Sequence, residues 1–493
     1  MKAVIVIDIG TSSVRGVLVS ADGQFLHLIQ KASEPDFLLD GRVEQNVSVW
    51  SDSLTEILGQ MDGFVKASAP KIEVQAVSIT SQRSSLIVLD EKDEPLGPAI
   101  MWQDKRTIPV IESLRAVEEM VFRKTGSPLN PVYLAPKIRW LTENCPDMAA
   151  KASTYLSIAD YVAFLLTNRK QTDWTYASRT SMFHIYRKEW DPELLELFGA
   201  RPGQLCALCP PGSVLGPLQS GRFRDLSFHG VPVVSAGGDQ QNAALGLGLI
   251  EVGDCEINLG TGAYILSVAA ALPETFNGDA VINCYCLADK YVLETNLICC
   301  GSLIDWLKRV FFPEADAAGF YAALDLELSS NASQVVALPY FQGRGAPDWN
   351  SHATGSFLNL NLASERADLL NALVDGICFE VKTHLDIMER YMGQAVTAVK
   401  VAGGLGKNRR IMQKLSNILD RKLLIYSNPE ASAIGAFLQA MHALEPERPL
   451  AGLYEAIRAR DSVTCFVPEA DLERSQIDAS YEAFRESYRK LFA

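Results

Sequence analysis

The sequence predicts an α/β protein built from two similar domains. The chain has 493 residues, too many for one ordinary hydrophobic core, so two domains are expected. Two apolar runs joined by a glycine–hydroxyl turn occur at residues 4–19 and again at residues 255–268. Strand-to-helix transitions are expected at residues 231–250 and 398–419. Two related halves, each with a sheet and helices, account for the repeated pattern.

Composition and charge restrict the partners. Apolar residues make up 48% and charged residues 21% of the chain, as in globular proteins. The formal net charge of -14 argues against nucleic acid, which needs a basic surface. No apolar run reaches the roughly 18–20 residues of a membrane span, and the chain enters a strand without a leader pattern. Ten scattered cysteines suit a reducing compartment. We therefore expect a cytoplasmic protein with a small-molecule ligand, and leave open whether it is a homo-oligomer.

The opening hairpin is predicted to bind an anion. Its two apolar runs enclose Asp8 and a turn of small and hydroxyl residues, in the sequence VIVIDIGTSSVRGVLV (residues 4–19). Such a turn directs backbone N–H and side-chain O–H groups toward one point. A carboxylate beside bound phosphates is usually a ligand of Mg²⁺, so Asp8 is a candidate metal ligand. Arg15 is long enough to contact a phosphate oxygen. The alternative is an ordinary hairpin with a polar turn.

The second hairpin repeats this turn. Its sequence is CEINLGTGAYILSV (residues 255–268), with Gly260, Thr261 and Gly262 at the turn. Two such turns that face each other would clamp the phosphates of a nucleoside triphosphate. The chain lacks the G-x-x-x-x-G-K-[ST] motif of P-loop enzymes. The sequence GGLGKN (residues 403–408) is better explained by close approach of the backbone to a flat ligand such as adenine.

Three further segments complete the predicted organisation. Residues 231–250 are expected to form a strand, a turn and a helix, with the domain boundary at residues 243–251. Residues 208–218 are rich in proline and glycine and are expected to form a loop. The last segment, residues 481–492, has the pattern of an amphipathic surface helix.

The ordered set of motifs resembles the FGGY family of carbohydrate kinases. The resemblance covers nearly the whole chain. Its main motifs are D-x-G-T-S-S-x-R (residues 8–15), GDQQ (238–241), GTG (260–262), and GG with Asn408 (403–408). Further matches are SQRSS (81–85), WQDKRT (102–107), KIRWLTEN (137–144), PYFQGRGAPDW (339–349) and EASAIGA (430–436).

The resemblance implies a fold and a reaction. The family has two actin-like (ribonuclease H-like) domains around a catalytic cleft that closes by a hinge. Residues 1–246 would be the N-terminal sugar-binding domain and residues 247–493 the C-terminal nucleotide-binding domain. ATP and Mg²⁺ are the implied cofactors. Closure excludes water, which would otherwise accept the phosphoryl group.

The resemblance also implies a role for individual residues. Asp239 would be the general base, although any aspartate before a helix can instead act as an N-cap. Asp8 and Asp239 would border the metal. The implied substrate-binding residues are Gln82, Arg83, Trp102, Tyr133, Asp239, Gln240 and Tyr264. The implied nucleotide-binding residues are Thr11, Ser12, Ser13, Arg15, Gly260, Thr261, Gly262, Gly301, Gly403, Gly404 and Asn408.

The substrate pocket departs from the glycerol kinase pattern at two positions. Ser84 stands where glycerol kinases have a glutamate, and Val132 where they have a tyrosine. Both side chains are smaller, which leaves room for a longer substrate, and the Met-His pair of xylulokinases is absent after Gln82. We expect a glycerol-like or xylulose-like polyol or ketose of three to five carbons. The alternatives are an actin-like ATPase and a catalytically silent sugar sensor.

Overall fold

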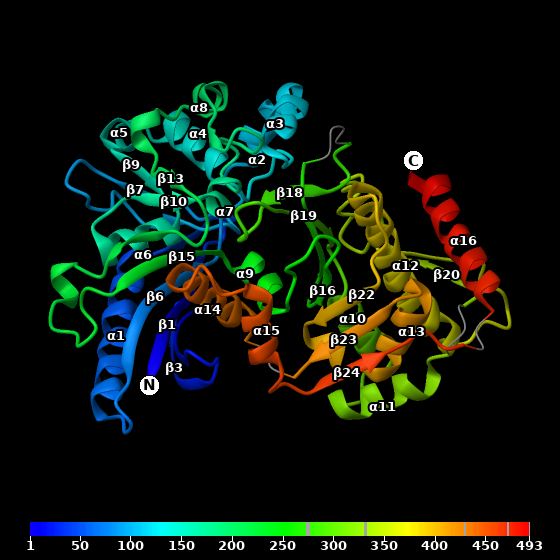
Figure 1. Ribbon diagram of the computed structural model, residues 1–493. Coiled ribbons are helices and arrows are strands. Elements are labelled where there is room, and N and C mark those ends of the chain that lie inside the picture. The colour runs from blue at the N-terminus through cyan, green and yellow to red at the C-terminus, as the bar shows by residue number, and fades with distance from the viewer. Residues whose placement is uncertain (273–276, 330–332, 428–429, 471–472, 493) are drawn as a thin grey trace.

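The protein contains two large sheets, one in each half of the chain (Figure 1). The computed structural model describes residues 1–272, 277–329, 333–427, 430–470 and 473–492. In this part of the chain, no helix is long and apolar enough to cross a membrane.

The first sheet has six strands in the order β14-β15-β6-β1-β2-β3. Strands β1, β6 and β15 run parallel, and the other neighbours pair antiparallel. The strands are β1 (Lys2–Ile9), β2 (Ser13–Ser20), β3 (Phe25–Ala32), β6 (Glu73–Ser81), β14 (Val214–Pro217) and β15 (Pro232–Gly238).

The second sheet has seven strands in the order β18-β19-β17-β16-β22-β23-β24, with β16, β22 and β23 parallel. They are β16 (Cys255–Leu259), β17 (Ala263–Ala269), β18 (Val281–Cys284), β19 (Tyr291–Leu297), β22 (Ala398–Ala402), β23 (Lys422–Tyr426) and β24 (Val463–Phe466). Both predicted hairpins are confirmed, since β1 pairs antiparallel with β2 and β16 with β17.

Short strands form five small sheets. They are β4 (Asp36–Phe37), β5 (Val43–Gln45) and β8 (Ala99–Ile100); β7 (Ile87–Leu89) and β9 (Thr154–Leu156); β10 (Gln171–Asp173) and β13 (Ala207–Cys209); β11 (Phe183–His184) and β12 (Glu189–Trp190); and β20 (Val336–Leu338) and β21 (Ser356–Leu358). The prediction of a loop at residues 208–218 was wrong in part, because β13 and β14 occupy both of its ends.

Helices cover both faces of the first sheet, and α12 and α13 pack on the second sheet. Those of the first half are α1 (Ser48–Ala67), α2 (Ile108–Ser113), α3 (Glu118–Thr125), α4 (Leu134–Asn144), α5 (Pro146–Lys151), α6 (Ile158–Thr167), α7 (Trp174–Ala177), α8 (Pro192–Phe198) and α9 (Asp239–Gly246). Those of the second half are α10 (Gly301–Phe311), α11 (Ala317–Glu327), α12 (Arg366–Met392), α13 (Arg409–Leu419), α14 (Ala431–Leu444), α15 (Leu450–Arg458) and α16 (Arg474–Phe492). Short 3₁₀ turns are η1 (Arg115–Val117), η2 (Pro202–Gln204), η3 (Gly221–Phe223) and η4 (Gly404–Lys407).

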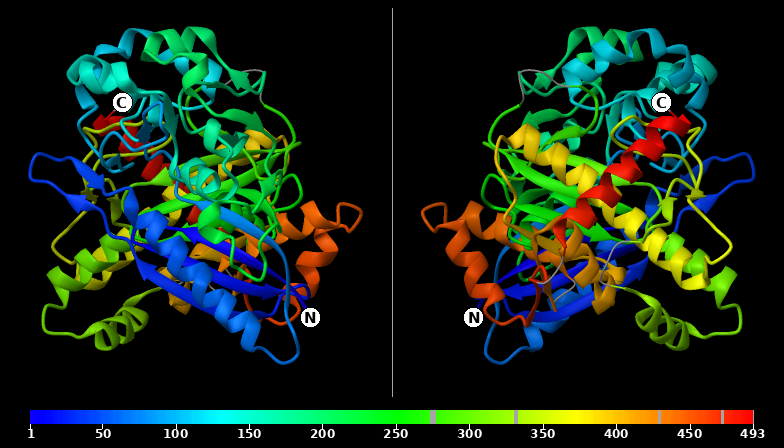
Figure 2. Two further views of the ribbon diagram at one scale, coloured as in Figure 1. Left: turned by 90° about the vertical axis from the view of Figure 1, so that its left-hand side faces the viewer. Right: turned by 90° about the vertical axis from the view of Figure 1, so that its right-hand side faces the viewer.

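The apolar opening strand is explained by burial on two sides. Ile5 and Ile7 pack into a core with α1 and α6, whereas Val4 and Val6 pack into a second core with α9 and α14. A parallel strand that is covered on both faces consists of a nearly continuous run of apolar residues. Figure 2 shows α1 lying across the outer face of this sheet in its left-hand view.

The second half of the chain returns to the first sheet. Helix α14 packs on α9 and on strands β1, β6 and β15, although it follows the last parallel strand of the second sheet. Figure 1 shows α14 and α15 in orange beside the first sheet. The predicted amphipathic C-terminal helix is confirmed as α16, which packs its apolar side on α12 and β20.

Candidate active site

Three adjacent parallel strands form the floor of the site at their carboxyl ends. Strands β1, β6 and β15 lie side by side, so the residues that follow them meet at one edge of the sheet. Asp8 is level with Thr80 on β6, and Thr80 is level with Gly237 on β15. Asp8, Arg83 and Asp239 are therefore brought together from positions far apart in the sequence.

Hydrogen bonds fix the turn that carries Asp239. Gly238 is the N-cap and Asp239 begins helix α9, so the alternative role of Asp239 as an N-cap is wrong. The Asn242 side-chain amide donates to the carbonyl oxygens of Gly237 (2.8 Å) and Gly238 (3.2 Å). Thr175 Oγ1 accepts a hydrogen bond from the Gly238 N–H (3.0 Å). The backbone is thus held from two sides, and the position of the carboxylate with it.

Burial destabilises the charge of both carboxylates. Burial, and then the negative charge of Asp239, raise the pKa of Asp8 to about 7. Burial also raises the pKa of Asp239, while the guanidinium of Arg83, whose Nε lies 3.7 Å from Asp239 Oδ1, lowers it. Two carboxylates in such an environment favour a nearby cation.

The donor set fits Mg²⁺ held together with phosphates. Mg²⁺ is usually bound through one or two carboxylates, and waters and substrate phosphates complete its coordination. Asp8 and Asp239 supply two carboxylates. Among the residues that the structure describes, no group of three or more His, Cys, Asp or Glu side chains could hold a metal by itself. The chemistry of this edge therefore suits a phosphate-bound divalent ion.

An ion-paired cluster lies beside Asp239 and contains two residues that the sequence analysis missed. Arg83 Nη1 is 3.7 Å from Glu294 Oε2, and Arg179 Nη1 is 4.0 Å from Glu294 Oε1. All three side chains are 11% exposed. Arg83 Nη1, Arg179 Nε and Glu294 Oε2 have no hydrogen-bond partner within the described ranges. These polar atoms are thus buried beside Asp239 without a hydrogen bond, which is unusual in a folded protein and is typical of a functional site.

Two of the predicted substrate residues contact the first turn. Gln82 Nε2 donates to the Gly10 carbonyl (3.0 Å), and the Trp102 indole N–H donates to Thr11 Oγ1 (3.0 Å). Trp102 is 37% exposed, so its ring also has a free face. The predicted sugar side and the predicted phosphate turn are therefore in direct contact.

Tyr133 and Tyr264 occupy different environments. Tyr133 is buried beneath the guanidinium of Arg179, which lies 4.8 Å from its ring centroid. Tyr264 is 41% exposed on β17. A buried tyrosine shapes the wall of a pocket, whereas an exposed one offers its ring to a ligand.

A buried lysine supports this wall. The Lys137 side chain is fully buried, and its ammonium donates to the carbonyl oxygens of Ser84 (3.1 Å), Pro131 (3.3 Å), Val132 (2.6 Å) and Tyr133 (3.0 Å). Burial lowers the pKa of Lys137 to about 7. Lys137 thus ties together both segments in which the pocket departs from the glycerol kinase pattern.

The second turn is tightly packed against glycines from two other segments. The Gly301 N–H donates to the Gly260 carbonyl (2.8 Å), and a Cβ on Gly301 would lie 2.5 Å from that oxygen. Gly403 has a φ of 92°, and a Cβ there would lie 2.3 Å from the Leu259 carbonyl oxygen. Only glycine fits such approaches, and the bare backbone is left open to a ligand.

A cavity of about 410 Å³ lies over this second turn. It is lined by the turn itself (residues 260–262), Tyr264 and Asn296, and also by Gln240 from the first turn of α9. Gln240 is the neighbour of Asp239, so the candidate base and the second phosphate turn border the same space.

Two predicted nucleotide-binding residues already have protein partners. Arg15 Nη1 donates to Glu430 Oε2 (3.1 Å) beside α14. Asn408 is the N-cap of α13, where its side chain accepts from the Ile411 N–H (2.8 Å) and donates to Asp325 (2.9 Å). The roles of Arg15 and Asn408 toward a nucleotide stay predictions, as do those of Ser12, Ser13 and Gly404.

Comparisons with known proteins agree over most of the chain. Models of the N-terminal and C-terminal domains of the FGGY family of carbohydrate kinases match residues 3–246 and 255–444. A glycerol kinase of Alcanivorax borkumensis is 31% identical over 458 residues, which are 88% of this chain and 88% of that protein.

Two solved structures share the fold. The structure of Plasmodium falciparum glycerol kinase with ADP superposes with a TM-score of 0.91 at 24% identity, covering 100% of this chain and 99% of the other. A ligand-bound xylulose kinase from Lactobacillus acidophilus gives a TM-score of 0.91 at 22% identity, with the same coverage. The predicted two-domain α/β fold is confirmed.

Proposed function

Because this chain belongs to the FGGY family of carbohydrate kinases, it is an ATP-dependent sugar or polyol kinase, and we propose that its acceptor is a glycerol-like or xylulose-like polyol or ketose. The glycerol kinase relative and the unpartnered polar atoms of Arg83, Arg179 and Glu294 support an acceptor rich in hydroxyl groups. The acceptor site comprises Gln82, Arg83, Trp102, Tyr133, Asp239, Gln240 and Tyr264.

We assign Asp239 the role of general base. The acceptor oxygen forms a bond to the γ-phosphorus, the bond from that phosphorus to the β–γ bridging oxygen breaks, and ADP leaves. The hydroxyl proton moves to the Asp239 carboxylate. A pKa raised by burial makes this carboxylate a better proton acceptor. Arg83, 3.7 Å from Asp239, keeps the carboxylate oriented.

The nucleotide is proposed to bind between the two turns. Its phosphates would contact Thr11, Ser12, Ser13 and Arg15 on one side and residues 260–262 with Gly301 on the other; its adenine would lie at Gly403, Gly404 and Asn408. Asp8 and Asp239 would hold Mg²⁺, which neutralises phosphate charge when bound. The close-packed glycines around the second turn support this arrangement, since a side chain at Gly301 or Gly403 would push apart the backbone segments that form it.

One observation carries the proposal. The cavity over the second phosphate turn is also lined by Gln240, which adjoins Asp239 at the N-terminus of α9. A phosphoryl group held by Thr261 would therefore lie near the carboxylate that accepts the proton. The positive end of the α9 dipole faces the same space and favours developing negative charge.

A coupled ADP-release assay with Mg·ATP and a panel of polyols, ketoses, aldoses and sugar acids tests the proposal. We expect a polyol or ketose to raise ADP release far above the rate without acceptor. For Asp239→Asn we expect kcat to fall by about 100-fold or more, the contribution of a general base, with the KM for ATP nearly unchanged.

Asp160→Asn is the matched control. Asp160 is also a buried carboxylate in the first turn of a helix, with a pKa raised to about 6 by burial, but it caps α6 away from the site. This control should leave kcat unchanged. A strong preference for a sugar acid would refute the acceptor class. A large rise in acceptor KM with kcat retained in Asp239→Asn would show that Asp239 binds and does not abstract the proton.

A further inference from the structure

A large cavity lies outside the proposed acceptor site, in the cleft between the two halves. It has a volume of about 1250 Å³ and is bounded by residues 108–131 of the first half and residues 342–351 of the second. Small-molecule sites usually measure about 300–1,000 Å³. An acceptor of three to five carbons would leave most of this space unused. We call it the outer cleft.

The outer cleft adjoins the proposed acceptor site. Asn296 and Ile298 line both the outer cleft and the cavity over the second phosphate turn. Asn130 and Pro131 line it on the opposite wall, directly before Val132 and Tyr133 in the chain. The position where the pocket has a small valine is thus next to the outer cleft.

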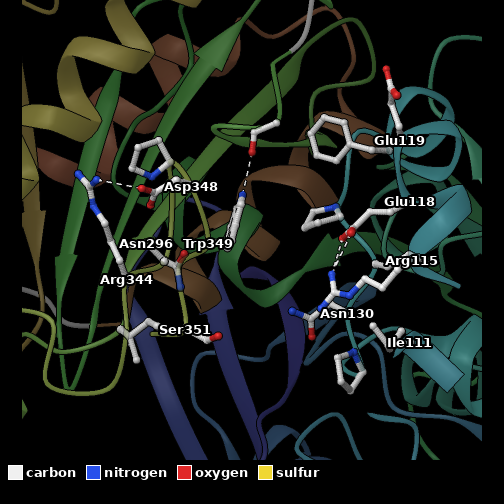
Figure 3. A pocket seen from close by; sticks show the side chains of 18 of the residues that line it. Ile111, Arg115, Glu118, Glu119, Asn130, Asn296, Arg344, Asp348, Trp349 and Ser351 are labelled. Atoms are coloured by element: carbon white, nitrogen blue, oxygen red, sulfur yellow. Dashed lines mark hydrogen bonds and ion pairs between the residues drawn. The ribbon is translucent and has the colours of Figure 1, made fainter. Parts of the chain in front are cut away.

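A rigidly held tryptophan stands in the outer cleft. Figure 3 shows Trp349 between the two walls. Its indole N–H donates to the Gly278 carbonyl (2.8 Å), and its backbone N–H donates to the Gly345 carbonyl (2.8 Å). Its φ of 52° is in the left-handed region, which is unusual for a bulky residue. Strain of this kind concentrates at ligand sites.

The charges of the outer cleft favour a neutral ligand. Arg115 pairs with Glu118 (2.8 Å), and Arg123 pairs with Glu119. On the other wall Arg344 pairs with Glu380 (2.7 Å). Because each of these guanidinium groups already has a carboxylate partner, an anionic ligand would find no free positive charge among them. Amide side chains and an aromatic face, as at Asn130, Asn296 and Trp349, suit a polyhydroxylated sugar ring instead.

We propose that the outer cleft binds a second, uncharged sugar unit of the acceptor, which stacks on Trp349 while the reacting polyol or ketose lies beside Asp239. The substrate class is therefore a glycosylated polyol or ketose, longer than the reacting unit alone. This inference rests on the proposed function. Phosphorylation itself follows the step given above, and the second unit contributes binding energy remote from the reacting hydroxyl.

Two matched pairs of acceptors test it: glycerol with 2-O-α-glucosylglycerol, and xylitol with xylobiitol. For at least one pair we expect kcat/KM of the extended acceptor to exceed that of the short one by 10-fold or more. Trp349→Leu removes the stacking surface. Ile108→Trp fills the cleft from α2, where Ile108 is 40% exposed and tolerates a larger side chain. Each variant should lower kcat/KM for the extended acceptor at least 10-fold and change that for the short acceptor less than 2-fold.

The control is Leu326→Trp, which adds the same side chain on α11 at a residue that is 88% exposed and outside the cleft. This variant should leave kcat/KM unchanged for both the extended and the short acceptor. The inference is overturned if Ile108→Trp lowers kcat/KM equally for the extended and the short acceptor, or for neither. That result is expected if the outer cleft is only a gap that closes during turnover. Calorimetric binding of xylobiitol and glucosylglycerol without ATP separates this result from failure of the proposed function, because it needs no turnover. Absence of binding by both extended probes also overturns the inference.

Discussion

Asp8 is a buried carboxylate whose charge is unfavourable in the protein before ligands bind. Its pKa is about 7 in the folded protein and 3.8 in an unfolded chain, so the folded state binds the extra proton between these values. The stability that this group contributes is fully present below pH 4 and is lost as the pH rises toward 7. Asp8→Asn should therefore stabilise the nucleotide-free protein at pH 8 by about 1–3 kcal/mol, an effect that fades toward pH 4.

Urea unfolding at pH 5 and pH 8 without nucleotide measures this effect. Asp90→Asn is the control, because backbone N–H groups of Lys92 and Glu94 lower the pKa of Asp90, and its replacement should not stabilise the protein at pH 8. Stabilisation of Asp8→Asn by the same amount at both pH values would contradict the assigned cause. Mg·ATP should stabilise the wild type more than the variant, since Asp8 is a proposed metal ligand.

Lys137 is predicted to set the acceptor wall without contacting the acceptor. Replacement by methionine keeps the buried chain but leaves four carbonyl oxygens without the ammonium that they share. We expect Lys137→Met to lower stability by about 2–4 kcal/mol and to raise the KM for the acceptor about 10-fold, while the KM for ATP stays within 2-fold. Steady-state kinetics with each substrate varied, together with thermal unfolding, measure both effects.

Lys414→Met separates positioning from stability. Lys414 is equally buried but pairs with Asp375 (2.9 Å) on α12, in the core of the second half. This variant should lose stability and keep its acceptor KM. If both lysine variants raised the acceptor KM alike, the effect would be general loosening and not a role of Lys137.

At the residue scale, the sequence predicted the groups that stand in a recognisable local pattern. Asp8 lies at the end of the apolar strand β1 and Asp239 directly follows the strand β15, and these positions place both at the same sheet edge. Arg179 has no comparable local signal. Glu294 had one, since it is a lone carboxylate in an apolar strand, but its partners lie on other segments. Ion pairs between distant segments depend on the fold, so the spacing of residues along the sequence does not predict them.

At the element scale, helices α9 and α14 cross at backbone contact. A Cβ on Gly246 would lie 1.8 Å from the Ala431 carbonyl oxygen, and one on Gly435 would lie 1.9 Å from the Asn242 carbonyl oxygen. Gly435→Ala must therefore move the two helices apart. We expect a loss of about 3 kcal/mol in stability, the upper end for overpacking, and a lower kcat because α9 carries Asp239.

Gly59→Ala is the matched control for this crossing. Gly59 lies on α1, and a Cβ there would meet no atom within 4 Å, so the change should stabilise the protein slightly through helix propensity. Thermal unfolding and kcat, measured for both variants, test whether the close crossing of α9 and α14 is needed for stability and turnover. A Gly435→Ala enzyme with wild-type stability would show that the crossing adjusts freely.

The hairpins could be predicted because their apolar runs and turns are local, whereas the position of α14 could not. Helix α14 packs on β1 and β6, which precede it by more than 300 residues, and no local pattern carries that information. The same reason explains the error at residues 208–218. Strands β13 and β14 are short, and glycine and proline residues lie in and around them. Their extended form depends on pairing with β10 and β15, which are distant in the sequence.

At the scale of the whole molecule, the division at residues 246 and 247 is proposed as a boundary between sugar and nucleotide binding. It does not separate two independent cores. Ile434 and Phe437 of α14 are buried in the same core as Val4 and Val6 of β1. One face of the first sheet is thus covered by the second half of the chain.

This shared core predicts how the protein unfolds. We expect one cooperative calorimetric transition for the full chain, because loss of the second half uncovers the apolar face formed by β1, β2 and β15. A fragment of residues 1–246 should lack a cooperative transition and expose apolar surface to a hydrophobic dye. Gly435→Ala should lower the single transition as a whole, since it disturbs the element that joins the halves. Two resolved transitions in the full chain, or a fragment that unfolds cooperatively, would mean that α14 docks on a sheet already stable without it, and that closure of the cleft moves two independent bodies.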